Sequence, residues 1–217
     1  MKRLLSIVFA SAALVCAAET KSALEADPRG WKDVTPAKGW VRVPIPTTAT
    51  LNPENQWRYD PKLKLLICSG DKGHEMLRSG REYKDLIFHI EWRFARAEGK
   101  EQPRYNSGVF VRSSANGEYF VQAQMGGGPN VWLFADYPVN GKKERVNLRD
   151  QMTAERTRGA GEWNVFEMTV KGPSVSLWVN GATIGSYDKV PVDKGYIGVE
   201  AEGFYVEFGK MMVKELK

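Results

Sequence analysis

Apolar and polar side chains alternate along residues 85–96. Every second position is apolar: Leu86, Phe88, Ile90, Trp92 and Phe94. The positions between them include three polar residues: His89, Glu91 and Arg93. A period of two is that of a β-strand, and the contrast between its faces is typical of a strand buried on one side. This segment therefore predicts a strand with an apolar inner face and a polar outer face.

Further short runs of the same kind occur along the chain, at residues 63–68, 108–112, 119–125, 164–171, 175–179, 196–200 and 205–213. Asn-Gly pairs stand between such runs at residues 116–117, 140–141 and 180–181. Asn followed by Gly tolerates the positive φ angles of a two-residue hairpin turn, so each pair indicates a hairpin. The clearest case is the stretch from Trp178 to Ile184.

Helical periodicity is nearly absent. Its only candidate is residues 146–158, whose apolar positions are too sparse for a buried stripe. Many short antiparallel strands predict an all-β protein in which two sheets pack as a sandwich, with a barrel as the alternative. The segment from residue 136 to 161 is expected to be a long loop, and loops of that length are often functional.

The N-terminus has the pattern of an export signal. Lys2 and Arg3 precede an apolar run over residues 4–15, and small residues follow at 16–18. This run is shorter than a membrane-spanning helix, so we expect cleavage after Ala18 and a periplasmic or extracellular protein. Lipid attachment at Cys16 is the alternative, and Val15 disfavours it because a small residue usually precedes such a cysteine. The expected organisation is a signal peptide at 1–18, a polar leader at 19–30 and one domain at 31–217.

Composition supports one globular domain, since 42% of the 217 residues are hydrophobic and 26% are charged. Cleavage would remove Lys2 and Arg3 and lower the formal net charge from +5 to +3. The remaining charges alternate in sign along the chain, which argues against nucleic acid as a partner. No second apolar segment approaches membrane length, so we expect no membrane span after cleavage. Cys68 would be the sole mature cysteine and is expected to be a small buried side chain.

Six pieces of the chain carry a family resemblance. They are residues 85–93, the stretch Asn106-Ser107-Gly108-Val109-Phe110-Val111-Arg112, and residues 119–122, 161–164, 178–181 and 195–200. Together they resemble the 3-keto-disaccharide hydrolase domain family over roughly residues 30–217. The resemblance implies a concanavalin A-like β-sandwich of the jelly-roll type, usually exported by bacteria. It also implies action on sugars whose C3 hydroxyl has been oxidised to a ketone.

The chain departs from the family pattern at three points. Phe120 stands where the family usually has Glu before a Val-Gln pair, and Phe208-Gly209-Lys210 stands where it often has Phe-Arg-Asn. Glu200 stands where the family has a Gln near the last strands. The loss of the usual Glu at Phe120 motivates an alternative function, a non-catalytic carbohydrate-binding module. A structural or interaction domain on the same sandwich is a third hypothesis.

Strand alternation yields a set of polar candidates for the chemistry that the resemblance implies. A ketone at C3 acidifies the C2 proton, so a site needs a general base near C2 and a donor or cation near the C3 oxygen. Glu91 or Glu200 is the candidate base, and Arg112 is the candidate stabiliser of the oxyanion. The candidates for sugar binding, expected on the same outer face, are Gln122, Gln124, Trp178, Arg93 and His89.

Plainer interpretations stand beside these. Glu91 and Arg93 also suit a solvated face with cross-strand ion pairs, and Arg112 suits a structural ion pair. His74 lies in a polar turn after Asp71, and His89 also suits a strand residue that faces water. Two histidines and one mature cysteine are too few for a Cys/His zinc site. A divalent cation held by carboxylates and carbonyls is compatible with the sequence, because such sites have no short signature outside the EF-hand.

Overall fold

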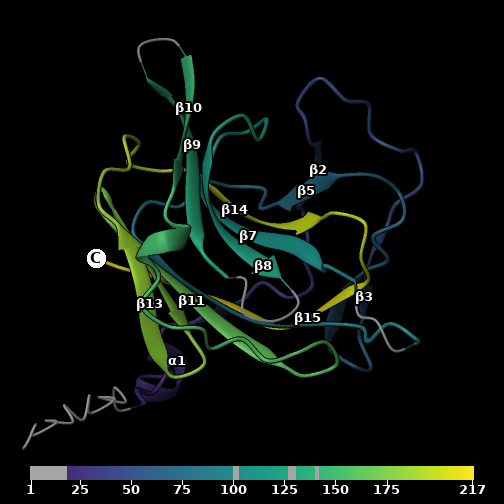
Figure 1. Ribbon diagram of the computed structural model, residues 1–217, viewed down its shortest axis with the longest axis horizontal. Coiled ribbons are helices and arrows are strands. Elements are labelled where there is room, and N and C mark those ends of the chain that lie inside the picture. The colour runs from purple at the N-terminus through teal and green to yellow at the C-terminus, as the bar shows by residue number, and fades with distance from the viewer. Residues whose placement is uncertain (1–18, 100–102, 127–130, 140–141) are drawn as a thin grey trace, which may run out of the picture.

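We describe the protein from a computed structural model that places residues 19–99, 103–126, 131–139 and 142–217. Two antiparallel sheets pack against each other as two layers (Figure 1). The predicted all-β sandwich is therefore confirmed. The expected signal peptide at 1–18 and the Asn-Gly pair at 140–141 lie outside the described residues. Within those described, we find no helix with the length and apolar character that crossing a membrane requires.

Sheet A has the strand order β13-β12-β11-β6-β15-β4-β3 among the described residues, and β1 pairs with the later part of β15. Its strands are β1 (Lys32–Asp33), β3 (Trp57–Asp60), β4 (Leu65–Cys68), β6 (Leu86–Phe94), β11 (Asn164–Lys171), β12 (Ser174–Val179), β13 (Ala182–Tyr187) and β15 (Val206–Glu215).

Sheet B has the order β10-β9-β8-β7-β14-β5-β2 over the same described ranges. Its strands are β2 (Val41–Pro44), β5 (Glu75–Arg78), β7 (Asn106–Ser113), β8 (Phe120–Gly126), β9 (Leu133–Val139), β10 (Lys142–Asn147) and β14 (Tyr196–Ala201). The helical elements placed by the structure are short: α1 (Ala23–Ala26) and the 3-10 turn Arg149–Gln151.

One apolar core fills the space between the sheets. Phe88, Ile90 and Trp92 on β6 are buried in it, as the alternation along this strand predicts. Cys68 is also buried there as a free thiol, and burial raises the pKa of its side chain to about 12. The Asn180-Gly181 pair joins β12 to β13 with positive φ at both residues, which confirms that hairpin.

The segment at 136–161 is not one long loop. Its first half completes β9 and forms β10, which pair over six positions from Lys142↔Val139 to Asn147↔Phe134. This pairing escaped the sequence analysis because Lys142–Asn147 is almost entirely polar and mostly exposed, so it shows no apolar alternation. Nor does the helical pattern at 146–158 produce a helix longer than the 3-10 turn.

The polar leader crosses the outer face of sheet A. Ser22 and Glu25 form a capping box at the start of α1, which satisfies amide groups that a helix end leaves free. The amides of Ala23 and Leu24 donate to the Glu167 carboxylate on β11 at 2.6 and 3.1 Å. Close to them, the Trp178 indole donates to the Thr20 hydroxyl at 2.9 Å. The leader is thus part of the folded domain.

Arg112 departs from the alternation of its strand. Opposite it, the register of β14 shifts between Tyr196 and Gly198, and Arg112 takes a positive φ of 53°. This bulge turns the guanidinium away from the outer face and buries it to 1% exposure. It donates to the Lys84 carbonyl at 2.7 Å, the Gly172 carbonyl at 2.9 Å and the Asp85 carboxylate at 3.1 Å. Arg112 therefore ties sheet B to turns of sheet A.

We predict that Arg112→Lys lowers the free energy of unfolding by about 3 kcal/mol, because one ammonium group cannot serve the separate acceptors that the guanidinium fork reaches. Urea unfolding followed by tryptophan fluorescence measures the change. Arg58→Lys is the matched control, since Arg58 is exposed and pairs only at 3.4 Å with Asp60, and its effect should stay within about 0.5 kcal/mol. Equal effects of the two substitutions would contradict the bridging role of Arg112.

Candidate functional site

The outer face of sheet B brings together three of the predicted residues. Gln122 and Gln124 project from β8 and Glu200 from β14, with β7 between these strands. The Gln122 amide donates to Glu200 Oε2 at 2.8 Å, and it also donates to Gln124 Oε1 at 3.2 Å. All three residues are buried, with Gln124 the most exposed at 9%.

Gly108 on β7 makes this contact across a strand possible. A Cβ atom at this position would lie 2.1 Å from Gln122 Nε2 and 2.8 Å from Glu200 Oε2. Both distances are shorter than any van der Waals contact, so a side chain here would push the amide and the carboxylate apart. The glycine therefore leaves the space in which Gln122 reaches over β7 to Glu200.

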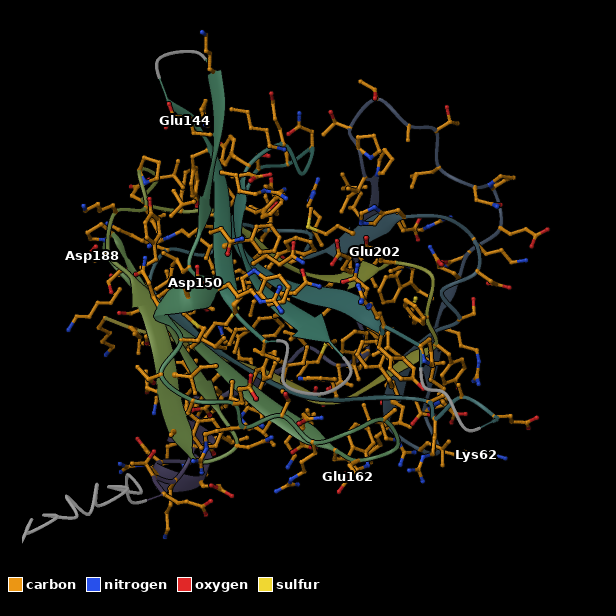
Figure 2. The ribbon with its side chains drawn as sticks, viewed as in Figure 1. Lys62, Glu144, Asp150, Glu162, Asp188 and Glu202 are labelled. Carbon is orange, nitrogen blue, oxygen red and sulfur yellow. The ribbon has the colours of Figure 1, made fainter. Side chains whose placement is uncertain are left out.

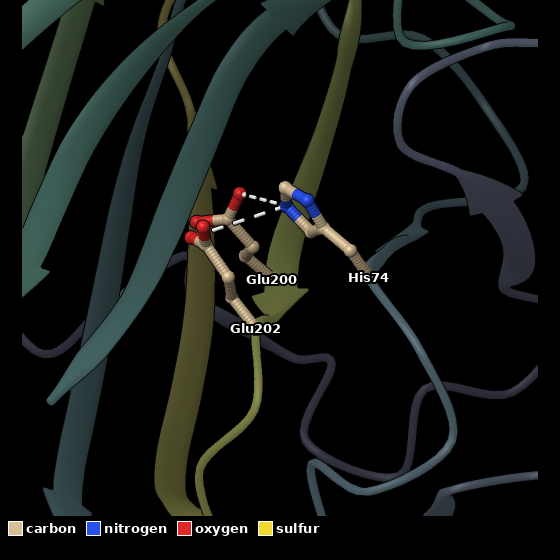
Figure 3. Close-up of side chains that lie close together, drawn as sticks. All are labelled: His74, Glu200 and Glu202. Atoms are coloured by element: carbon tan, nitrogen blue, oxygen red, sulfur yellow. Dashed lines mark hydrogen bonds and ion pairs between the residues drawn. The ribbon is translucent and has the colours of Figure 1, made fainter. Parts of the chain in front are cut away.

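His74 and Glu202 complete the cluster, one just before β5 and the other just after its antiparallel neighbour β14. His74 immediately precedes β5, and Glu202 follows β14. Figure 3 shows the three side chains converging, with His74 Nε2 at 2.8 Å from Glu200 Oε1 and at 3.9 Å from Glu202 Oε2. Figure 2 shows Glu202 near the middle of the molecule. His74 and Glu202 are each about one third exposed, so the cluster is open to solvent on this side.

The charges of this cluster shift its pKa values. Burial lowers the pKa of His74, but the hydrogen bond and charge of Glu200 outweigh it, so the net shift is above the ordinary value of 6.5. Burial and the neighbouring charge of Glu200 raise the pKa of Glu202, against an opposing effect of His74. His74 thus carries a proton over a wider pH range than a free imidazole does.

The same three residues have a donor set that a divalent cation could use. One ligand atom from each of His74, Glu200 and Glu202 lies within 4.8 Å of the other two. One imidazole nitrogen and two carboxylate oxygens suit a divalent transition metal with open positions for water or substrate. Among the described residues, this cluster is the candidate site for a divalent cation, with an imidazole in addition to the carboxylates that the sequence analysis considered.

A second group of charges lies on β9 and β10. Asp136 is buried to 1% exposure and accepts hydrogen bonds from the Arg145 guanidinium at 2.7 and 2.8 Å, while Lys143 approaches it at 3.0 Å. Burial raises the pKa of Asp136, but these two cations outweigh it and lower the pKa below its usual range. The hydrogen bonds to Asp136 raise the pKa of Arg145 above its usual value. Arg145 also lies over the Phe134 ring, 4.8 Å from its centroid.

An aromatic cluster underlies these polar groups. The Phe120 ring packs edge to face on Phe110 at 5.0 Å and on Phe134 at 5.8 Å between centroids. Val43 and Met76 belong to the same cluster, which is separate from the core between the sheets. Phe120 itself lies opposite Asp136 in the pairing of β8 with β9. The face thus combines a carboxylate, an imidazole, amides and aromatic rings, a mixture that suits sugars.

The other predicted residues lie elsewhere. His89, Glu91, Arg93 and Trp178 are on β6 and β12 of sheet A. Arg93 pairs with Glu207 at 2.6 Å and lies over the Trp163 ring, as a structural cation would. Arg112 is buried at the bulge of β7. The residues that we expected on one face therefore lie on sheet A, on sheet B and, for Arg112, inside the fold. Alternation did not reveal this, because it does not tell which sheet a strand joins.

Sequence reasoning did not select His74, Glu202, Asp136 or Arg145. His74 and Glu202 lie outside the regular strands, where alternation gives no information, and 126 residues separate His74 from Glu200. Asp136 and Arg145 fell within the segment expected to be a loop. The one available signal was Asp136 between the apolar residues of β9, since a buried strand carboxylate needs a cationic partner.

Comparison with known proteins places the chain in a family and a fold. The pattern of the 3-keto-alpha-glucoside-1,2-lyase-like domain family matches residues 27–214. No curated protein matches the chain in sequence.

Solved structures share the fold at low identity. A candidate glycosyl hydrolase from Parabacteroides distasonis has 17% identity and a TM-score of 0.59, over 92% of this chain and 100% of that one. The carbohydrate-binding module CBM66 from Bacillus subtilis has 13% identity and a TM-score of 0.57, over 82% and 96% of the two chains. A β-1,3-1,4-glucanase from a mouse hindgut metagenome has 12% identity and a TM-score of 0.51, over 86% and 93%.

We predict that His74 titrates above pH 6.5 in the metal-free protein and that Glu200→Gln lowers this midpoint, because the substitution removes the facing negative charge. Imidazole NMR signals measure both midpoints. The pKa of His74 is higher in the folded than in the unfolded protein. The contact between His74 and Glu200 therefore stabilises the protein fully below pH 6.5, and this contribution is lost as the pH rises through the folded pKa of His74. His89 is the internal control, as it pairs with Glu167 instead. An unchanged His74 midpoint in Glu200→Gln would contradict the contact.

Proposed function

The chain belongs to the 3-keto-alpha-glucoside-1,2-lyase-like domain family, and we propose that it cleaves glycosidic bonds of 3-keto sugars on the outer face of sheet B. The observation that carries this proposal is the environment of Glu200. His74, which is about one third exposed, contacts one of its carboxylate oxygens and Gln122 the other, each at 2.8 Å. A carboxylate held in this way is oriented for proton transfer.

The reaction begins at C2 of the oxidised ring. Glu200 removes the C2 proton, and the electron pair of that C–H bond forms a C1=C2 double bond as the C1–O bond breaks. The departing oxygen takes a proton from His74, which hydrogen-bonds to the same carboxylate. Addition of water across the double bond, with H to C2 and OH to C1, gives net hydrolysis. The first step alone is an elimination, as a lyase performs it.

Other residues of the face bind the sugar and stabilise charge. Gln122 and Gln124 offer amide groups to ring hydroxyls, and the cluster around Phe120 lies beneath the same surface. Arg145 lies over the Phe134 ring on the same outer face and would supply positive charge for the oxygen at C3 as it becomes an enolate. This assignment replaces Arg112, which is buried inside the fold, whereas the Arg145 side chain is 60% exposed.

Export is a further part of the proposal. The basic and apolar pattern of residues 1–18 suits a signal peptide that leads to the periplasm or the medium. A 3-keto sugar outside the cytoplasm would then be within reach of the enzyme.

We predict that Glu200→Gln lowers release of the C1 substituent from a 3-keto-α-glucoside by at least about 100-fold, because an amide cannot take the C2 proton. Glu144→Gln is the matched control, since Glu144 is an exposed carboxylate on β10, and it should retain full activity. A substrate deuterated at C2 reports the first step directly through loss of deuterium to water. The assay is run with and without divalent cations, because His74, Glu200 and Glu202 could share one.

The outcome also decides between the enzyme and the binding module. A protein that binds the 3-keto sugar but releases no product at any pH or with any cation would be a carbohydrate-binding module. Undiminished turnover in Glu200→Gln would remove Glu200 from the role of base while leaving the family activity in place.

A further inference from the structure

A pocket of about 190 Å³ opens on the outer face of sheet A, on the opposite side of the sandwich from Glu200. The leader forms one wall, and strands β6, β11, β12 and β15 form the rest. The residues that matter here are Ser22, Leu24, His89, Glu91, Trp178 and Lys210. Figure 1 shows α1 on the side of the molecule that carries β11 and β13. None of the residues assigned above to the reaction lines this pocket.

The strongest sign of a ligand is an unpartnered nitrogen of His89. This side chain is only 3% exposed, and its Nδ1 lies 2.8 Å from Glu167 Oε1. Since a carboxylate only accepts hydrogen bonds, Nδ1 carries the proton and Nε2 is left for another partner. Among the described residues, Nε2 makes no hydrogen bond; its ion-pair contact with Glu91 Oε1 spans 3.7 Å, which is too long for one. A buried polar atom without a hydrogen bond is destabilising, and a ligand hydroxyl would supply the missing bond.

Two charged side chains next to His89 form a matched pair for neighbouring hydroxyl groups. A bulge in β15 between Phe208 and Met211 contains Lys210, whose ammonium lies 3.3 Å from Glu91 Oε1. Adjacent hydroxyls of a sugar ring can accept from the ammonium and donate to the carboxylate at the same time. Because Lys210 and Glu91 balance each other, the pair favours a neutral ligand over an ionic one.

Trp178 supplies the apolar part of the pocket. Its indole is half-buried, and the hydrogen bond to the Thr20 hydroxyl fixes the ring against the leader. An aromatic surface of this kind suits the C–H face of a sugar. The volume is below the 300–1,000 Å³ typical of pockets for larger ligands, so it admits one ring.

We propose that this pocket is a second sugar site, which binds one neutral pyranose ring through a pair of adjacent hydroxyl groups. Its residues come from sheet A and the leader alone. The site therefore stands independently of the reaction proposed for sheet B, and the loss of either function leaves the other testable.

The test uses the chain from residue 19 to 217 with Glu200→Gln, so that no turnover occurs on sheet B. Methyl α-D-glucopyranoside, then the corresponding β-glucoside, galactoside and mannoside, are titrated while the ¹⁵N signals of the imidazoles are recorded. The chain has two histidines, so the signals are assigned with one substitution, His74→Asn. We expect saturable movement of the His89 Nε2 signal with at least one of these glycosides, and little movement of His74.

Substitutions of Lys210 and Glu91, which line the pocket, then test whether the ligand binds there. Lys210→Ala and Glu91→Gln should each weaken binding about tenfold or more, because each removes one of the paired hydroxyl contacts. Lys210 is 55% exposed, so its truncation should leave the fold intact, which a thermal melt verifies. Lys189→Ala, at an exposed lysine in the loop after β13, is the matched control and should bind like the parent.

Two results would overturn the proposal. One is a His89 signal that stays fixed with all four glycosides up to the solubility of each. The other is binding that Lys210→Ala and Glu91→Gln leave as tight as in the parent, which would place the sugar elsewhere.

Discussion

The packing of two sheets around one apolar core determines on which side of each strand the polar side chains can lie. A strand in such a sandwich has one buried face, and in the described residues that face is filled by side chains such as Phe88, Ile90 and Val199. Polar residues on these strands must therefore face outward unless a bulge interrupts the alternation of side chains. Arg112 shows the exception, since a bulge with positive φ turns it inward, where carbonyl groups and Asp85 surround it.

Alternation predicted the strands and their inner faces well, because it is a local property of the sequence. It identified β6 almost residue for residue and the hairpin at Asn180-Gly181. It could not predict which strands become neighbours, since pairing depends on contacts between residues far apart in the chain. Glu91 and Glu200 were thus equivalent in the sequence, although the structure places them on opposite sheets.

The remaining parts of both sites depend on residues outside regular strands. His74 reaches Glu200 from a turn before β5, and the leader closes the pocket over His89. For the leader a local signal existed, because Ser22 and Glu25 have the spacing of a capping box. For His74 no local signal existed, because a histidine in a polar turn gives no indication of the strand that will lie beside it.

The departures from the family pattern gain a physical meaning on sheet B. Phe120 and Glu200 lie on the same outer face, where the family pattern has Glu at the first position and Gln at the second. Phe120 now packs among aromatic rings, while Glu200 accepts hydrogen bonds across β7 from Gln122. The carboxylate on this face therefore comes from β14 instead of β8, and the amide of Gln122 can reach it because Gly108 has no side chain. In the reaction proposed above, the two changes would compensate each other, because Glu200 would act as the base from the other side of β7.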